Sequence, residues 1–228
     1  MAVAEGKIAR NPAQLVRPPK HVQREREPWS AADVKTFLAA ASADRLHAAW
    51  RLSLYGLRRG EVLGLRWADI DLPGKTLTVS QSRVLVEYQV RIEEPKSRNG
   101  LRTLPLDDAL VDALKALRKR QAQESAAAGP AYTGGYVVTN VLGEPVHPEW
   151  YSDEFGRLLK RAELRRITLH DSRHTTLTLM EHAGVPISVI SKWAGHYDAA
   201  FTQRTYVHAS GDDLKKGRQA LARIHKIG

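Results

Sequence analysis

The stretch YGLRRGEVLGL, residues 55–65, joins a helix stop to a helix start across a pair of arginines. Gly56 predicts the end of the preceding helix, because glycine is favoured just past a helix C-terminus. A new helix is predicted at 59–65, so Arg58 is expected at the corner between the two helices. Taken alone, this stretch is more readily explained as a capped helix start with an exposed Arg58 and Glu61 than as a functional site.

Helical patterns continue on both sides of this corner. Ser30 and Asp33 have the spacing of a capping box and predict a helix through Phe37, with Trp29 packed on its first turn. Leucines at helical spacing follow Asp107. Further helices are predicted near residues 44–55, 148–161, 172–183, 186–194 and 212–227.

Strand patterns are confined to the middle of the chain. Residues 75–80 alternate in polarity, residues 84–92 are rich in Val, Tyr and Ile, and residues 102–106 follow an Asn99-Gly100 turn signal. The predicted fold class is therefore α+β, mainly α, with a small three-stranded antiparallel sheet.

Composition narrows the classes of function. The 228 residues carry a formal net charge of +10, which attracts polyanions and makes nucleic acid the first candidate partner. An acidic membrane surface, or a merely basic soluble protein, are the alternatives. The absence of cysteine excludes disulfides, thiolate metal sites and cysteine nucleophiles. We expect neither a transmembrane helix nor a signal peptide, and place the protein in the cytoplasm.

The first 28 residues have the composition of a linker. Asn11-Pro12, Pro18-Pro19 and the charged run at 24–28 disfavour helices and supply nothing for a core. We therefore expect the folded domain to begin at Trp29.

Three further segments contain residue types that could do chemistry. Lys96 alone would be an ordinary solvated hairpin lysine, and Tyr206, ten positions after His196, would be half-buried packing. His170 and His174 are four residues apart, which is half of a metal site. That interpretation lacks the glutamate of the zinc-protease motif and a third ligand, so no metal and no other cofactor is expected.

The order of all the candidate residues along the chain favours a functional interpretation. Six residues with short flanking motifs run along the chain in the order Arg58, Lys96, His170, Arg173, His196, Tyr206. Together with the motifs at 55–65, 169–175 and 193–196, this order resembles the catalytic domain of tyrosine site-specific recombinases of the phage integrase family, over roughly residues 29–210. Ser172 stands where that family commonly has an aliphatic residue, and Tyr197 where a small polar one is usual.

The resemblance implies an enzyme that breaks and rejoins DNA. Tyr206 would attack a phosphodiester and form a 3′-phosphotyrosine, with His170 as the candidate base and Lys96 as the candidate general acid. Arg58 and Arg173 carry planar guanidiniums that grip phosphate oxygens, a role that lysine fills less well. His196 would donate a hydrogen bond to a phosphate oxygen.

The expected partners are double-stranded DNA recombination sites, and the expected task is integration or excision of a phage or other mobile element. A type IB topoisomerase, or a catalytically inactive DNA-binding module with the same fold, are the alternatives. Glu61 could orient an arginine or lysine beside the site. Residues 157–173 hold six Arg or Lys and two Asp or Glu, an excess of +4 suited to phosphate contacts or to a merely solvated helix face.

The ends of the chain carry expectations about assembly. Residues 1–28 resemble a linker and the tail of a core-binding domain that is missing here. In the segment 211–228, Leu214, Leu221 and Ile224 form one apolar stripe. Packing of this helix on its own domain is one possibility. The resemblance instead implies docking on a neighbouring protomer, with a monomer when free and a homotetramer on DNA.

Overall fold

The computed structural model describes residues 5–11, 27–94 and 100–195. The helices of this part are α1 (Ala31–Ala40), α2 (His47–Ser53), α3 (Arg59–Gly64), α4 (Asp108–Ala128), α5 (Pro148–Arg161), α6 (Leu169–His182) and α7 (Ile187–Ala194), with 3₁₀ turns η2 (Trp67–Asp69) and η3 (Gly129–Ala131). The strands are β1 (Ile70–Asp71), β2 (Thr76–Val79), β3 (Ser82–Val86), β4 (Gln89–Glu93) and β5 (Arg102–Pro105).

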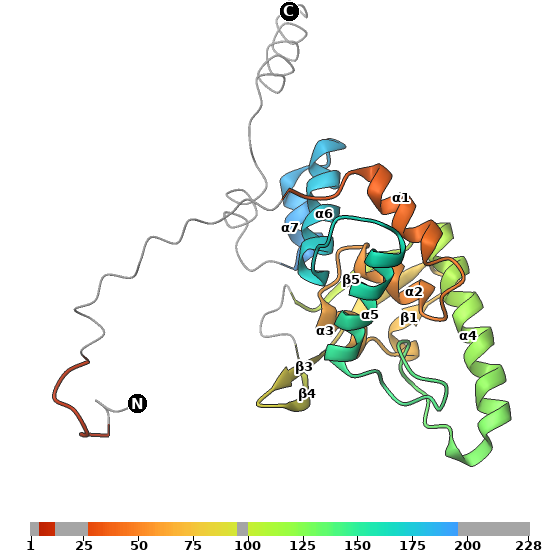
Figure 1. The fold of residues 1–228 in the computed structure, drawn as a ribbon, viewed down its shortest axis with the longest axis horizontal. Helices are drawn as coiled ribbons and strands as arrows, with labels where there is room; N and C mark the ends of the chain where they lie inside the picture. The colour runs from red at the N-terminus through yellow and green to blue at the C-terminus, as the bar shows by residue number, and fades with distance from the viewer. Residues whose placement is uncertain (1–4, 12–26, 95–99, 196–228) are drawn as a thin grey trace, which may run out of the picture.

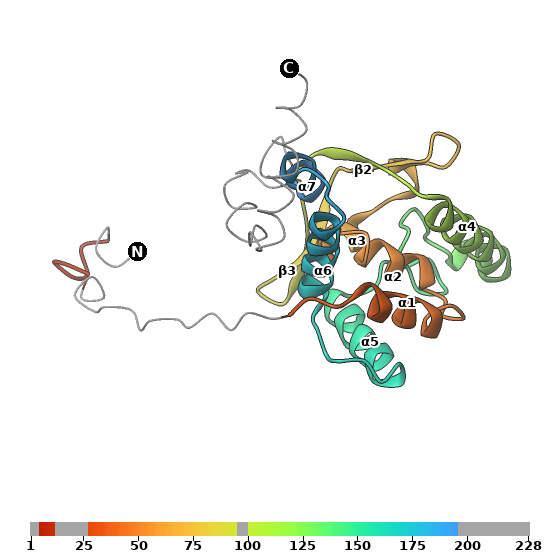
Figure 2. The ribbon, with the colours of Figure 1, turned by 90° about the horizontal axis from the view of Figure 1, so that it is seen from above.

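An aromatic cluster forms the centre of the helical part. Trp50 stacks on Tyr151 with ring centroids 4.4 Å apart, and Phe155 packs edge-on against Phe37 at 5.2 Å. Trp29 lies 5.6 Å from Phe37 and is 1% exposed. Burial of each such side chain stabilises the fold by about 1.5–3 kcal/mol. The cluster joins α1, α2 and α5, which lie on one side of β2 (Figure 2).

Trp29 also ties the start of the domain to a distant helix. Its backbone N–H donates to the Thr175 hydroxyl on α6 at 3.1 Å, and its indole N–H donates to the Arg165 carbonyl at 3.2 Å. Ser30 then caps α1 by accepting from the Asp33 N–H, and Asp33 accepts from the Ser30 N–H. The predicted capping box is confirmed.

The small sheet has the predicted form but a different membership. Strands β1, β2 and β5 make a three-stranded antiparallel sheet in which Leu77 lies opposite Leu104. Residues 84–92 do not join it; they belong to the separate β3–β4 hairpin, so that part of the prediction was wrong. The hairpin turns at Glu87 and Tyr88, whose φ values are +49° and +64°. Such turns usually contain Asn or Gly. Because these two residues are neither, the sequence did not predict this turn.

Helix α6 begins earlier than the predicted residue 172. Thr168 accepts a hydrogen bond from the Asp171 N–H, and Asp171 accepts from the Thr168 N–H, so this capping box starts the helix at Leu169. His170 and Arg173 therefore lie one turn apart on the same helix. Helix α4 carries the leucine pattern that follows Asp107 and runs from Asp108 to Ala128. The predicted helix at 212–227 lies outside the described residues.

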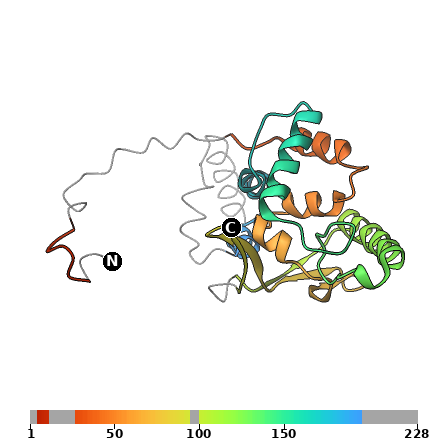
Figure 3. The same cartoon turned by 60° about the horizontal axis from the view of Figure 1, so that its bottom comes forward.

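The two ends of the domain differ. Helices α6 and α7 pack together at one end, next to α3 and the β3–β4 hairpin, while α4 lies at the opposite end (Figures 1 and 3). In the described part of the chain, every helix is too short or too polar to cross a membrane.

Candidate active site

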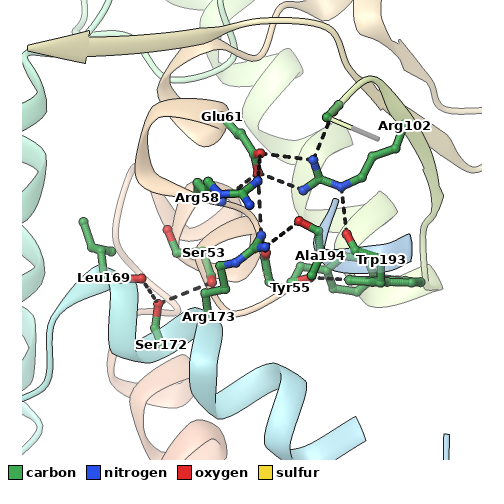
Figure 4. A network of polar contacts seen from close by, with 12 residues as sticks. Ser53, Tyr55, Arg58, Glu61, Arg102, Leu169, Ser172, Arg173, Trp193 and Ala194 are labelled. Atoms are coloured by element: carbon green, nitrogen blue, oxygen red, sulfur yellow. Dashed lines mark hydrogen bonds and ion pairs between the residues drawn. The ribbon is translucent and has the colours of Figure 1, made fainter. Parts of the chain in front are cut away.

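Three arginines from three different elements meet at one buried carboxylate, that of Glu61 on α3 (Figure 4). We call Glu61, Arg58, Arg102 and Arg173 the Glu61 cluster. Glu61 is 6% exposed. The alternative of a solvent-exposed Arg58–Glu61 pair is therefore wrong, and Glu61 does orient arginines.

The start of α3 brings the first arginine to this carboxylate. The Arg58 backbone N–H donates to Glu61 Oε2 at 2.8 Å, which caps the short helix and fixes the corner. The Arg58 guanidinium Nη1 donates to Oε1 at 2.7 Å. The Arg58 side chain remains 42% exposed, so it is the member of the cluster that faces solvent.

The second arginine, Arg173, comes from α6 and is 2% exposed. It donates to the carbonyl of Gly56 at 2.6 Å and to that of Ala194, the last residue of α7. Its Nη1 lies 3.9 Å from Glu61 Oε2. Gly56 is held at φ +90°, and an added Cβ would meet the Trp193 ring at 3.4 Å, so this corner requires glycine.

The third arginine, Arg102 at the start of β5, was missed by the sequence analysis. Its two terminal nitrogens donate to the two oxygens of Glu61 at 3.0 and 2.8 Å. Its Nε donates to the Trp193 carbonyl at 2.7 Å. A signal was present, because the strand alternation places residue 102 on the same inward face as Leu104, where a charged residue needs a partner.

Electrostatics favour an ionised Glu61 and a cationic cluster. Burial by itself raises the pKa of the Glu61 carboxyl, but hydrogen bonds and charge from Arg102, then charge from Arg58 and Arg173, outweigh it and lower the pKa to about 2. One carboxylate against three guanidiniums leaves the cluster a net charge of +2. That excess suits an anion.

His170 and His174 form a pair on α6. Their Nε2 atoms are 2.8 Å apart, so one ring donates and the other accepts. Burial first, and the neighbouring His170 second, lower the pKa of His174. The exposed side of α6 thus presents a histidine one turn before Arg173. Among the described residues, no group of three or more His, Asp or Glu side chains could hold a metal ion.

The structure describes half of the six predicted site residues. It brings Arg58 and Arg173 to the same carboxylate and puts His170 on the helix of Arg173. Lys96, His196 and Tyr206 lie outside the described residues. In the sequence, His196 directly follows Gly195, which ends α7 in a left-handed conformation.

The basic stretch 157–173 divides into a surface and a buried part. Its exposed members are Arg157, Lys160, Arg161, Arg165 and Arg166. Arg173 is buried in the Glu61 cluster and does not contribute to that surface, which corrects the predicted grouping of all six.

The sequence of this chain is similar to those of known proteins. The model of the phage integrase family matches residues 30–212. A tyrosine recombinase XerC-like protein of Caldanaerobacter subterraneus subsp. tengcongensis is 33% identical, over 91% of this chain and 58% of its own length. The ICEBs1 integrase of Bacillus subtilis is 26% identical, over 91% of this chain and 57% of its own length. The chain thus spans less than two thirds of these relatives.

Solved structures show the same fold. The Tn1549 transposon integrase in complex with transposon right end DNA superposes with a TM-score of 0.76 at 22% identity, covering 97% of this chain and 74% of that one. A lambda integrase dimer bound to a core site has a TM-score of 0.62 at 20% identity, with 90% and 55% covered.

Proposed function

Because the chain belongs to the phage integrase family, we propose that it is the catalytic part of a site-specific DNA recombinase. The observation that carries the proposal is the Glu61 cluster, in which Arg58 and Arg173 from separate helices share one carboxylate and leave a surplus of positive charge. Attack on a phosphodiester places extra negative charge on the non-bridging oxygens, and fixed guanidiniums stabilise that charge without a metal.

The proposed reaction keeps the bond energy of the broken diester in a protein–DNA ester. The Tyr206 oxygen attacks phosphorus, the bond from phosphorus to the 5′ oxygen breaks, and a 3′-phosphotyrosine forms. His170 accepts the tyrosine proton, and Lys96 gives a proton to the leaving 5′ oxygen. A 5′ hydroxyl of another strand then reverses these steps, so no cofactor is consumed. Arg58, Arg173 and His196 hold the phosphate oxygens.

The proposed partner is a double-stranded recombination site, and the proposed task is integration or excision of a phage or mobile element in the cytoplasm of a bacterial host. The net charge of +10 and the exposed arginines of α5 support the DNA partner. We further propose a monomer when free and a homotetramer on DNA, with residues 29–210 as the catalytic domain, residues 1–28 as a linker from a core-binding domain, and residues 211–228 as an exchange segment.

A type IB topoisomerase and an inactive DNA-binding module are less favoured. The two relatives described above are named a tyrosine recombinase XerC-like protein and an integrase, and neither is named a topoisomerase. The intact set of six residues argues against the inactive module.

Covalent trapping tests the proposal. A duplex selected from a randomised pool by binding to the protein is synthesised with nicks scanned along one strand, so that cleavage beside a nick releases a short fragment and traps the enzyme. We expect a protein–DNA adduct on a denaturing gel with the parent chain. Tyr206→Phe removes only the hydroxyl, so the adduct disappears while DNA affinity is unchanged. Tight binding with no adduct at any nick position would favour the inactive module, and an adduct in the variant would remove Tyr206 as nucleophile.

A further inference from the structure

Arg102 is buried in the Glu61 cluster, yet it belongs to none of the motifs that suggested the function. We propose that Arg102 is a positioning residue, which sets the geometry of the Arg58 and Arg173 guanidiniums through Glu61 and fixes the end of α7 beside them. The effect of Arg102 on DNA cleavage rests on the proposed function, whereas its effect on the other two arginines does not.

The N–H groups of Arg102 donate to partners on three separate elements. Besides the two bonds to Glu61, Nε donates to the Trp193 carbonyl at 2.7 Å, and Nη1 donates to the Gly100 carbonyl at 3.2 Å. A single planar group therefore joins β5, α3 and the last turn of α7 (Figure 4). Its side chain is only 4% exposed, so these bonds do not compete with water.

Arg102 and Arg173 bind neighbouring carbonyls at the end of α7. The carbonyls of the last two helical residues, Trp193 and Ala194, accept from Arg102 and Arg173 respectively. Terminal carbonyls of a helix have no partner within the helix and carry a partial negative charge, which cations stabilise. Because both guanidiniums also approach Glu61, a change in one alters the position of the other.

Each carboxylate oxygen of Glu61 accepts hydrogen bonds from two donors. Oε1 accepts from both Arg58 and Arg102, and Oε2 accepts from Arg102 and from the Arg58 backbone N–H. Without Arg102, each oxygen loses one charged donor. The half-exposed Arg58 and the nearby Arg173 are then the only guanidiniums of the cluster left to compensate a buried carboxylate. Both would be drawn toward Glu61 and away from an incoming phosphate.

The chain offers a matched control in Arg45. Arg45 also makes a two-pronged contact with a glutamate, Glu124, and donates to two backbone carbonyls, those of Thr139 and Asn140. Its side chain is 17% exposed, and Glu124 lies on α4, away from the Glu61 cluster. Arg45→Gln therefore removes a comparable set of bonds without touching the site.

The first experiment needs no DNA. Two-dimensional ¹H–¹⁵N spectra of the arginine Nε–H groups are recorded for the parent chain, Arg102→Gln and Arg45→Gln, with resonances assigned by single substitutions. We expect the signals of Arg58 and Arg173 to shift in Arg102→Gln and to stay in place in Arg45→Gln. Unchanged signals in Arg102→Gln, or equal shifts in both variants, would overturn the inference.

The second experiment measures single-turnover cleavage of the selected nicked duplex. At a temperature where all variants are folded, we expect Arg102→Gln to cleave roughly 10²-fold more slowly than the parent with unchanged DNA affinity, and Arg45→Gln to cleave like the parent. Arg102→Lys keeps the charge but not the fork, so it should recover only part of the rate. Equal rates in Arg102→Gln and Arg45→Gln would make Arg102 merely structural. An inactive parent would instead count against the proposed function and leave the spectral test of Arg102 in force.

Discussion

Two arginine–glutamate pairs tie distant segments of this chain together, one at each end of the molecule. Near α4, Arg45 joins Glu124 to the carbonyls at 139 and 140. Near α7, Arg102 joins Glu61 to the carbonyl at 193. In both pairs the arginine lowers the pKa of the glutamate: at Glu124 its hydrogen bonds are the largest effect, and at Glu61 they oppose a larger contribution from burial.

The difference lies in what surrounds each carboxylate. Glu124 has one further cation, the half-exposed Arg120 at 3.6 Å, one helical turn away on the same helix. Glu61 has two further guanidiniums, one from the corner before its own helix and one from α6, and its side chain is 7% exposed against 15% for Glu124. The Arg45–Glu124 pair connects a loop to a helix, whereas the Glu61 cluster holds more positive charge than its one carboxylate neutralises. Surplus charge in a nearly dry cluster is a sign of function rather than of stability.

The largest expected contrast is in catalysis. Arg58→Ala removes the most exposed guanidinium of the surplus and should slow single-turnover cleavage of the nicked duplex by roughly 10²–10³-fold. Arg45→Ala at the other end should leave the rate within about threefold of the parent, because it contacts no reacting group. If Arg58→Ala also stayed within about tenfold of the parent, the surplus charge would have no catalytic use and the comparison would fail.

The next contrast is in stability. Glu61→Gln leaves three guanidiniums without a counter-charge, two of them buried, and should lower the free energy of unfolding by about 3–5 kcal/mol. Glu124→Gln leaves a partly exposed arginine and should cost about 1–2 kcal/mol. Urea unfolding followed by tryptophan fluorescence measures both. A larger cost at Glu124 would show that the α4 pair, and not the Glu61 cluster, is the main ionic tie of the fold.

The smallest contrast is in the response to acid. The pKa of Glu61 is about 2 in the folded chain and near its ordinary value when unfolded, so its contribution is complete above about pH 5 and is lost as the pH falls toward 2. Between pH 5 and pH 3 the parent should lose about 2 kcal/mol through this group. The loss should be absent from Glu61→Gln and present in Arg45→Gln. A Glu61→Gln variant with the full acid response would place that titration elsewhere.

Local signals predicted much of this arrangement. Ser30 and Asp33 marked the start of α1 by hydrogen bonds that act over a few residues, and the structure has that capping box. Gly56 was expected to end the preceding helix, but α2 ends at Ser53 and is capped by Leu54, so Gly56 lies in the turn that follows. Contacts between distant segments were harder. The Arg102–Glu61 contact joins residues 41 apart, and nothing short-range specifies it; only the inward position of residue 102 hinted that it needed a partner.

The burial of Arg173 is a second feature that short-range sequence patterns did not predict. Its place in a run of basic residues suggested a surface, because charge runs are usually solvated. The capping box at Thr168 starts α6 three residues early, and the contacts of Arg173 with Gly56 and Ala194 turn its side chain inward. The sheet was similarly recognised in kind, while the hairpin turn at Glu87 and Tyr88 was hidden by its unusual residues.

The contacts of Trp29 determine how a force on the N-terminal segment is transmitted to the domain. The chain enters the domain here: the Glu27 and Pro28 carbonyls accept from the Arg165 side chain, and Trp29 then donates to Thr175 on α6 and to the Arg165 carbonyl before that helix. Tension applied to the polypeptide ahead of residue 29 therefore reaches α6, which carries His170 and Arg173, as directly as it reaches α1. A force on the N-terminal segment is therefore transmitted to the helix that supplies two of the three described site residues.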